Sequence, residues 1–275
     1  MFRTVLPSFL FYLQAAGHTG YAALQAKRGR LDNPGLVRGS HALRRALESV
    51  GVGFEVTGLD QVDWNGGPYV FVANHMSALE TQILPSILHQ GAPCTFVTKS
   101  SLLRYPVFGA VLRAFDPIVV NRADPRADLR HVVEQGCRRL RDGVSVIIFP
   151  QAHRTPGFDR RMFNSIGMRL ARAAGVPMVP VALDTAAWTQ GRWLKDIGWI
   201  VPSRPVRFAI GAPIAVGDDG AAAHRRVMAF IEARMATWIA AGPGETAIAA
   251  ADQDEAHGAD RLGVPTGPGP VSPAP

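Results

Sequence analysis

Cysteine is scarce in this sequence. Only Cys94 and Cys137 occur among the 275 residues, and they lie 43 positions apart and form no C-x-x-C pair. So few cysteines exclude a disulfide-dense secreted fold and a cysteine-rich zinc site. The two thiols are typical of a reducing compartment, and nothing in their placement supports a disulfide.

Motifs of several other chemistries are missing too. The eight histidines include no H-E-x-x-H pair, so the sequence predicts no metal site. No G-x-S-x-G stretch is present, which argues against the serine nucleophile of an α/β-hydrolase. Because zinc-finger spacing and an RNP aromatic block are both absent, no nucleic-acid partner is predicted either.

Long hydrophobic runs are also lacking. The apolar run from Val5 to Ala16 has 12 residues, and Gly17 to Gly20 interrupt it. A helix that spans a bilayer needs roughly 20 apolar residues. The run is therefore too short to cross a membrane by itself.

Two interpretations of this run remain open. One is a secretory signal peptide, since Arg3 precedes the apolar segment and small residues follow it. The favoured one is a helix in a membrane interface, because the first 45 positions hold seven basic residues and one acid, and apolar insertion and attraction to anionic lipid reinforce each other. The sequence predicts a membrane-associating segment over residues 1–40, and a peripheral or monotopic protein on the cytoplasmic face of the inner or plasma membrane.

Acidic residues are fewer than basic residues over most of the chain. Five of the 22 acidic residues follow Gly242, so residues 1–241 hold 28 basic and 17 acidic residues, a net charge of +11. A GC-rich genome would explain why 26 of the 29 basic residues are arginine, but not the excess of positive charge. With nucleic acid set aside, the charge indicates an anionic membrane or a phosphorylated substrate.

Hydrophobic patterning predicts strands that alternate with helices. Such alternation is typical of an α/β domain with a largely parallel central sheet flanked by helices. We expect this domain over residues 41–241, followed by a disordered, acidic tail rich in Pro, Gly and Ala over residues 242–275. The expected strands cover 54–59, 69–73, 95–98, 117–120, 144–149, 176–183 and 206–210, and the expected helices cover 40–51 (capped by Ser40), 77–89, 125–141, 163–174 and 221–240.

A histidine and a carboxylate follow the second expected strand. Asn74 and His75 come directly after the buried run, and Glu80 lies five residues beyond His75. The carboxyl ends of strands in such sheets bind ligands, and a carboxylate that orients an imidazole makes it a general base. The alternative is a capping box, in which Ser77 and Glu80 close a helix and His75 is a loop histidine.

Arginines follow two later strands. Arg122 comes after the strand at 117–120, and Arg154 lies in Phe-Pro-Gln-Ala-His-Arg at the end of the strand at 144–149. Guanidinium groups at two strand ends can hold a phosphate, because each offers a planar fork of donors. The alternative is a solvated surface arginine, since nearly one residue in ten is arginine.

The order of these blocks resembles the phosphate acyltransferase family that includes bacterial 1-acylglycerol-3-phosphate acyltransferases. That family carries N-H-x4-D, then a strand ending in a basic residue, then F-P-E-G-T-R, then V-P-I-V-P. The four blocks occur in that order between Asn74 and Val181, and the stretch from Lys99 to Gly109 resembles the link between the first two. The resemblance covers roughly residues 55–215.

The resemblance implies a reaction and a set of roles. His75 would deprotonate an acceptor hydroxyl, which attacks an acyl thioester, and Glu80 would orient His75. Arg122 and Arg154 would hold the acceptor phosphate, and the remaining residues implied in substrate binding are Asn74, Lys99 and Gln151. The partners would be a lysophospholipid acceptor at a membrane surface and acyl-CoA or acyl-carrier protein as donor, with no cofactor and no metal.

Two departures from the family pattern bear on specificity. Glu80 replaces the aspartate, and Gln151-Ala152-His153 replaces E-G-T. A glutamate can serve in the dyad, but Gln151 loses a charge and Ala152 adopts positive φ less easily than glycine. A different lysophospholipid or another lipid hydroxyl therefore remains open as acceptor, as does a non-catalytic lipid-binding protein on the same fold.

Overall fold

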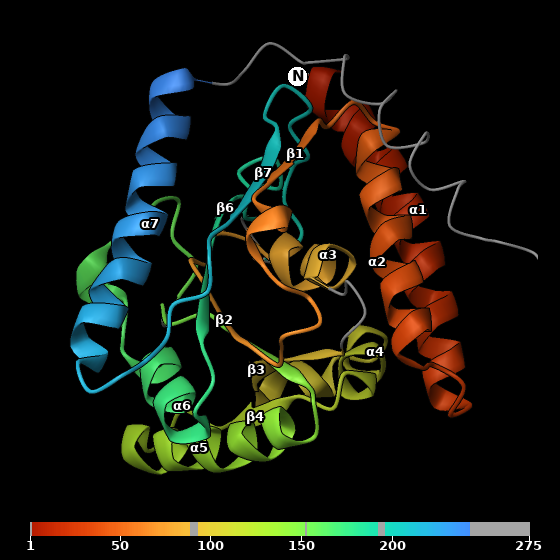
Figure 1. Cartoon of the computed structure of the whole chain (residues 1–275). Coiled ribbons are helices and arrows are strands. Elements are labelled where there is room, and N and C mark those ends of the chain that lie inside the picture. The colour runs from red at the N-terminus through yellow and green to blue at the C-terminus, as the bar shows by residue number, and fades with distance from the viewer. Residues whose placement is uncertain (1, 89–92, 152, 192–195, 243–275) are drawn as a thin grey trace, which may run out of the picture.

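A seven-stranded sheet forms the centre of the protein (Figure 1). The computed structural model describes residues 2–88, 93–151, 153–191 and 196–242. The sheet order is β1-β7-β6-β2-β5-β3-β4, and every neighbouring pair is parallel except β6 and β7. The largely parallel sheet is therefore confirmed. The strands are β1 (Phe54–Thr57), β2 (Val70–Ala73), β3 (Cys94–Lys99), β4 (Ile118–Val120), β5 (Ser145–Ile148), β6 (Met178–Asp184) and β7 (Val206–Ile210).

Helices flank both faces of the sheet. Helices α5, α6 and α7 pack along one face, and α3 packs on the other, where α2 and then α1 lie outside it (Figure 1). The central strands β2 and β5 are buried along their whole length, as a parallel strand covered on both faces must be. The helices are α1 (Phe2–Lys27), α2 (Asn33–Glu48), α3 (Leu79–Leu88), α4 (Phe108–Ala114), α5 (Pro125–Arg141), α6 (Ile166–Ala174) and α7 (Gly220–Ala241).

In the N-terminal region, one expectation is wrong: the helix expected over 40–51 begins earlier. Helix α1 runs without a break through Gly17 and Gly20, because helical glycine costs only about 1 kcal/mol and packing against α2 and α4 supports the helix. Helix α2 begins at Asn33, where the Asp32 carboxylate accepts the N–H of Gly35 at 2.8 Å. Ser40, the expected cap, lies inside α2.

The other boundaries follow the expectation closely. Helix α5 and strand β7 match it residue for residue, and helix α6 begins three residues later than expected. Helix α4 was not expected, because Pro106 and Gly109 made its segment resemble a loop. His89 and the tail after Gly242 lie outside the described residues.

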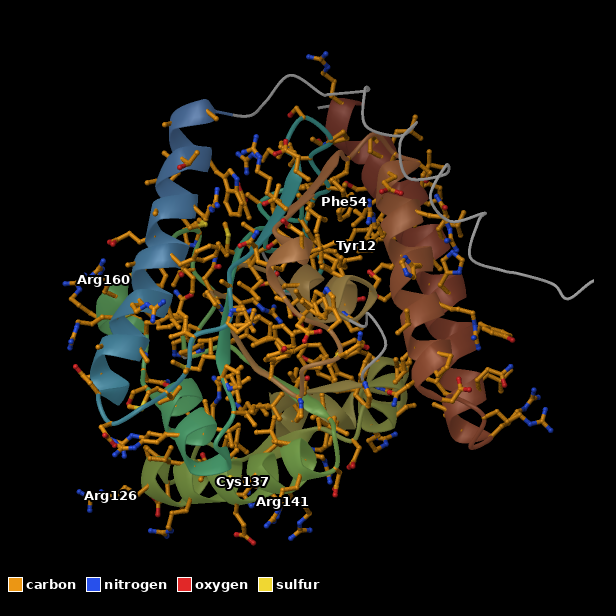
Figure 2. All side chains as sticks on the ribbon, viewed as in Figure 1. Tyr12, Phe54, Arg126, Cys137, Arg141 and Arg160 are labelled. Carbon is orange, nitrogen blue, oxygen red and sulfur yellow. The ribbon has the colours of Figure 1, made fainter. Side chains whose placement is uncertain are left out.

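Helix α1 is fixed to the domain by one face. Ile200 donates its N–H to Ser8 Oγ at 2.9 Å, and the Tyr12 hydroxyl donates to Gly198 O at 2.7 Å. Phe11 packs edge-on against Trp188 with ring centroids 5.1 Å apart. Burial raises the pKa of Tyr12 to about 12. The Tyr12 ring points from α1 toward the body of the protein, whereas Arg126, Arg141 and Arg160 lie at its surface (Figure 2).

The opposite face of α1 is apolar and exposed. Phe9 is 64% exposed and Leu13 63%, and Val5, Leu6 and Leu10 are exposed beside them. Within the described residues, no helix is long and apolar enough to cross a membrane. Helix α1 thus has one face bound to the domain and one face open to whatever surrounds the protein.

Candidate active site

The sequence-predicted residues gather at one edge of the sheet. Strands β2, β5, β3 and β4 are parallel neighbours, so their carboxyl ends share that edge. His75 follows β2, Gln151 and Arg154 follow β5, Lys99 ends β3, and Arg122 follows β4. The sheet order therefore brings together side chains that are far apart in the sequence.

His75 and Glu80 form a hydrogen-bonded dyad. His75 Nδ1 lies 2.9 Å from Glu80 Oε1, and the Phe149 ring stacks on the imidazole with centroids 4.5 Å apart. Glu80 is fully buried, whereas the His75 side chain is 16% exposed. An ionised carboxylate can only accept, so the proton lies on Nδ1 and the Nε2 lone pair is left to take a proton from a ligand.

Four further hydrogen bonds hold the Glu80 carboxylate. Oε1 accepts the backbone N–H groups of Met76 at 2.6 Å and Ser77 at 2.8 Å. Oε2 accepts the hydroxyls of Ser77 and Thr185, both at 2.9 Å. Oε1 caps the start of α3 and binds His75 at the same time. The capping and catalytic interpretations of Glu80 are therefore compatible in one geometry.

These contacts keep Glu80 ionised. Burial raises the pKa of the Glu80 carboxyl, but the hydrogen bond and charge of His75 and the backbone N–H of Ser77 lower it more, so the pKa lies below its ordinary value. Among the described residues, no three His, Cys, Asp or Glu side chains gather closely enough to hold a metal ion. The carboxylate is thus stabilised by hydrogen-bond donors and by the imidazole.

Gln151 supports the backbone around His75. His75 donates its N–H to Gln151 Oε1 at 2.9 Å, and Gln151 Nε2 donates to Thr155 Oγ1 at 2.7 Å. Thr155 in turn donates its N–H to His75 O at 2.9 Å. Where we expected a substrate contact, the structure places a buried amide with both ends occupied by the protein. A glutamate could not donate to Thr155, which gives a local reason for glutamine here.

Asn74 has a similar supporting position. Its Nδ2 donates to Leu183 O at 2.8 Å, and its Oδ1 accepts the N–H of Leu183 at 2.9 Å. The buried amide thereby continues the β2–β6 ladder past Ala73 and fixes the chain just before His75. Asn74, which we also expected to contact substrate, is bound to backbone instead.

The three basic residues differ in their surroundings. Arg154 forms an ion pair with Asp196, whereas Lys99 and Arg122 are exposed. Arg122 has a φ of 59°, and its N–H donates to the Asp128 carboxylate at 2.7 Å. It follows β4, three strands from His75, which is roughly 14 Å along the edge. Strand β3 lies between the strands that precede Arg122 and Arg154.

Thr185 and Asp196 were not predicted from the sequence. Thr185 directly follows β6 and hydrogen bonds to Glu80 from 105 positions away. A polar residue after a buried strand was the signal that selected His75, and the same signal applies to Thr185. Asp196 follows no strand directly, and no sequence pattern pairs it with Arg154.

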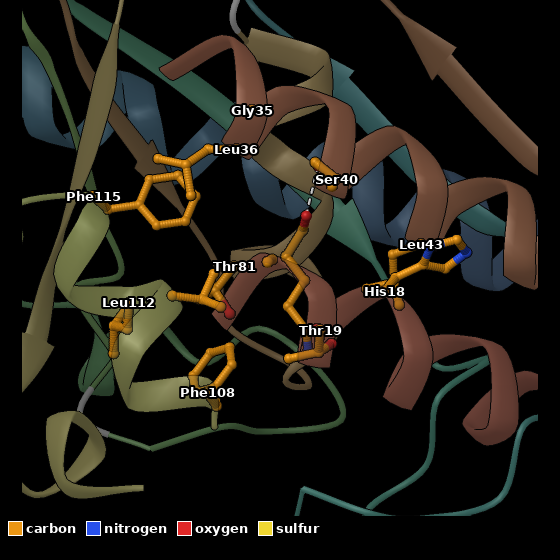
Figure 3. Close-up of a pocket in the computed structure, with 14 residues that line it drawn as sticks. His18, Thr19, Gly35, Leu36, Ser40, Leu43, Thr81, Phe108, Leu112 and Phe115 are labelled. Carbon is orange, nitrogen blue, oxygen red and sulfur yellow. Dashed lines mark hydrogen bonds between the residues drawn. The ribbon is translucent and has the colours of Figure 1, made fainter. Parts of the chain in front are cut away.

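An apolar cavity of about 60 Å³ lies between the α1–α2 pair and helices α3 and α4 (Figure 3). Its wall includes His18, Leu36 and Phe108, and none of the seven predicted site residues lines it. Ser40 in this wall donates to Gln82 O at 2.6 Å, which ties α2 to α3. The cavity is therefore separate from the His75–Glu80 dyad.

Comparison with known proteins finds a family that is similar to the central part of the chain. Residues 53–184, just under half of the chain, match the family model described as Acyltransferase. Over these residues the chain is similar to the acyltransferase family. The match includes the dyad, Gln151 and Arg154, and it ends one residue before Thr185.

Two curated acyltransferases of Pseudomonas aeruginosa are similar to the chain. The 1-acyl-sn-glycerol-3-phosphate acyltransferase is 29% identical over 189 residues, which cover 69% of this chain and 68% of that protein. The lyso-ornithine lipid O-acyltransferase is 29% identical over 117 residues, which cover 42% of this chain and 43% of that protein. Both relatives are named as acyltransferases that act on a lipid acceptor.

A solved structure shares the fold. The crystal structure of the 1-acyl-sn-glycerophosphate acyltransferase PlsC from Thermotoga maritima matches with a TM-score of 0.63. The match covers 86% of this chain and 96% of that one at 20% sequence identity. The likeness extends beyond residues 53–184 and therefore takes in elements outside the family match.

Ionised Glu80 gives a testable link between stability and pH. Because its folded-state pKa is lowered, its contribution is fully present above roughly pH 4.3 and is lost as the pH falls through the folded-state value. Glu80→Gln, which is uncharged, should lower the free energy of unfolding by about 1–3 kcal/mol at pH 7. The deficit should shrink as the pH falls below 4, as measured by urea unfolding.

Glu48→Gln is the control, since Glu48 is exposed and pairs with Arg44 on its own helix. Its unfolding free energy should stay close to that of the native chain at both pH values. A deficit for Glu80→Gln that is the same at pH 7 and pH 3.5 would contradict an ionised Glu80.

Proposed function

We propose that the protein transfers a fatty acyl group from an acyl thioester to the hydroxyl of a lysophospholipid such as 1-acylglycerol-3-phosphate. The observation that carries this proposal is the bond between His75 Nδ1 and the buried Glu80, which leaves Nε2 as the base. The family match and the named activities of the relatives support the same chemistry.

In the proposed reaction, His75 Nε2 takes the proton of the acceptor hydroxyl as its oxygen attacks the thioester carbonyl. The tetrahedral intermediate collapses, the carbon–sulfur bond breaks, and the imidazolium returns the proton to the leaving thiolate. Anionic Glu80 stabilises the imidazolium between these steps. A thioester is already activated, so no covalent acyl-enzyme is needed, and acyl-CoA or acyl-carrier protein is the proposed donor.

Charge along the sheet edge supports an anionic acceptor. Arg154 follows the strand next to β2, and Lys99 and Arg122 lie on the two strands beyond. A phosphate at this edge would meet guanidinium and ammonium donors, which bind phosphate through charge-assisted hydrogen bonds. The proposed acceptor therefore carries a phosphate close to its reacting hydroxyl.

We also propose that the exposed face of α1 binds the membrane surface from the cytoplasmic side. Phe9, Leu13 and their apolar neighbours would enter the headgroup boundary, at about 1.5–3 kcal/mol for each side chain buried. The basic residues Lys27, Arg28 and Arg30 follow at the end of the helix, where they would meet anionic lipid. A lipid acceptor would then reach the site without leaving the membrane.

A non-catalytic lipid-binding protein is the second candidate. The observation that favours it is the ion pair of Arg154 with Asp196, since an arginine already paired is less available to a reacting substrate. The oriented His75 argues the other way, because lipid binding alone requires no imidazole with a free Nε2. The two candidates differ in what the loss of His75 does.

His75→Ala tests the proposed reaction. Release of CoA from acyl-CoA by the native protein should depend on a lysophospholipid acceptor. The substitution should lower kcat by about 10²–10⁴-fold, the usual contribution of a general base. His131→Ala, which changes an exposed histidine on α5, should retain full activity.

Undiminished release by His75→Ala, or no release with any acceptor, would contradict the reaction. Equal lipid binding by both proteins without turnover would favour the second candidate.

Charge on the exposed face of α1 tests the membrane proposal. The double variant Phe9→Glu, Leu13→Glu should bind anionic vesicles at least about tenfold more weakly in co-sedimentation, since two buried apolar side chains are lost. Both side chains point away from the domain, so unfolding temperature should change little. Ile239→Glu is the control, because it places a glutamate on an exposed apolar position of α7, across the sheet from α1 (Figure 1). Equal vesicle binding by all three proteins would refute attachment through α1.

A further inference from the structure

Arg154 already has an anionic partner in this fold. Its Nη1 donates to Asp196 Oδ1, and its side chain is 21% exposed. Asp196 comes from the long connection between β6 and β7, 42 positions further along the chain. An intramolecular carboxylate therefore occupies part of the guanidinium that is expected to meet the acceptor phosphate.

The pair lies next to the base. Arg154 directly precedes Thr155, whose N–H donates to His75 O at 2.9 Å and whose hydroxyl accepts from Gln151. The backbone of Arg154 is thus one residue from Thr155, which is hydrogen-bonded to the His75 backbone. The Asp196 charge therefore acts on the guanidinium that is expected to bind the acceptor headgroup.

The backbone that follows Asp196 is held by helix α1 and by its own hydrogen bonds. Gly198, two residues beyond Asp196, accepts the Tyr12 hydroxyl, and Ile200 donates to Ser8. Thr189 and Trp199 close the connection through two further hydrogen bonds, at 2.8 and 3.0 Å. Helix α1 thus anchors the chain within a few residues of the Asp196 carboxylate that pairs with Arg154.

We propose that Asp196 determines acceptor specificity by competing with the acceptor's phosphate for Arg154. The inference rests on the proposed acyl transfer and names the headgroup charge that the site selects. A dianionic phosphomonoester gains most from a free guanidinium and meets repulsion from Asp196, whereas a zwitterionic headgroup loses little. Asp196 thereby reduces the preference for phosphomonoester acceptors and admits acceptors of lower negative charge.

The experiment compares two acceptors of equal acyl chain, 1-acylglycerol-3-phosphate and a lysophosphatidylethanolamine. Asp196→Asn keeps the shape of the side chain and removes its charge. It should lower KM for the phosphomonoester by about tenfold or more, since a hydrogen bond to a charged group is worth that much. It should leave kcat within about twofold, and KM for the zwitterionic acceptor should change by less than about twofold, because the chemistry at His75 is untouched.

Two further variants isolate the pair. In an Arg154→Gln background, Asp196→Asn should have no effect on KM, since the group it competes for is gone. Asp159→Asn is the matched control, because Asp159 is paired with Arg161 in the same connection after β5 and should not alter the ratio of the two acceptors. Equal changes for both acceptors would show that Asp196 only stabilises the fold, and an unchanged or raised KM for the phosphomonoester would equally overturn the inference.

Binding measured without turnover separates this inference from the proposed reaction. In a His75→Ala background, Asp196→Asn should tighten binding of short-chain 1-acylglycerol-3-phosphate in calorimetry by the same factor. If no acceptor is turned over by the native protein but this tightening occurs, the reaction fails and the role of Asp196 stands. If turnover occurs and binding does not tighten, the role of Asp196 fails alone.

Discussion

The hydrogen bond between His75 Nδ1 and the buried carboxylate of Glu80 is the interaction on which the site depends. A buried charge is costly unless donors surround it, and Glu80 has two backbone N–H groups, two hydroxyls and the imidazole. These donors come from the end of β2, the start of α3 and the residue after β6. Several elements of the fold thus contribute donors that keep the Glu80 carboxylate ionised and the His75 imidazole oriented.

The connection from Thr185 to Ile200 links that carboxylate to the N-terminal helix. Thr185 binds Glu80 at one end, Asp196 binds Arg154 in between, and Ile200 binds Ser8 of α1 at the other end. Trp188, packed against Phe11, fixes the same connection from the core side. The dyad, the arginine and the helix with the exposed apolar face are therefore parts of one hydrogen-bonded and packed unit.

Local patterns were enough to predict the sheet, whereas they left His75 and Glu80 open between a dyad and a capped helix start until the family order of the blocks favoured the dyad. Continuous apolar runs mark β2 and β5 because both faces of these strands are covered, and His75 was found because it follows such a run. The family order then selected Arg154 and Gln151, but not what they contact. Gln151 was expected to meet substrate and instead supports the His75 backbone, because both ends of its amide find protein partners.

The sequence did not predict hydrogen-bond and ion-pair partners that only the fold brings together. Ser40 is of a residue type that often caps helices, yet Asp32, eight residues earlier, is the cap, and Ser40 binds the backbone of α3 instead. Thr185 and Asp196 act on residues 105 and 42 positions away, which no local period reports.

The most direct test of the account is the protonation state of the His75 ring. Long-range ¹H–¹⁵N correlation spectra at neutral pH, assigned by comparison with His75→Ala, distinguish the two nitrogens. We expect the neutral imidazole of the native protein to carry its proton on Nδ1 and not on Nε2, because Glu80 can only accept. A proton on Nε2, or an even mixture of tautomers, would contradict it.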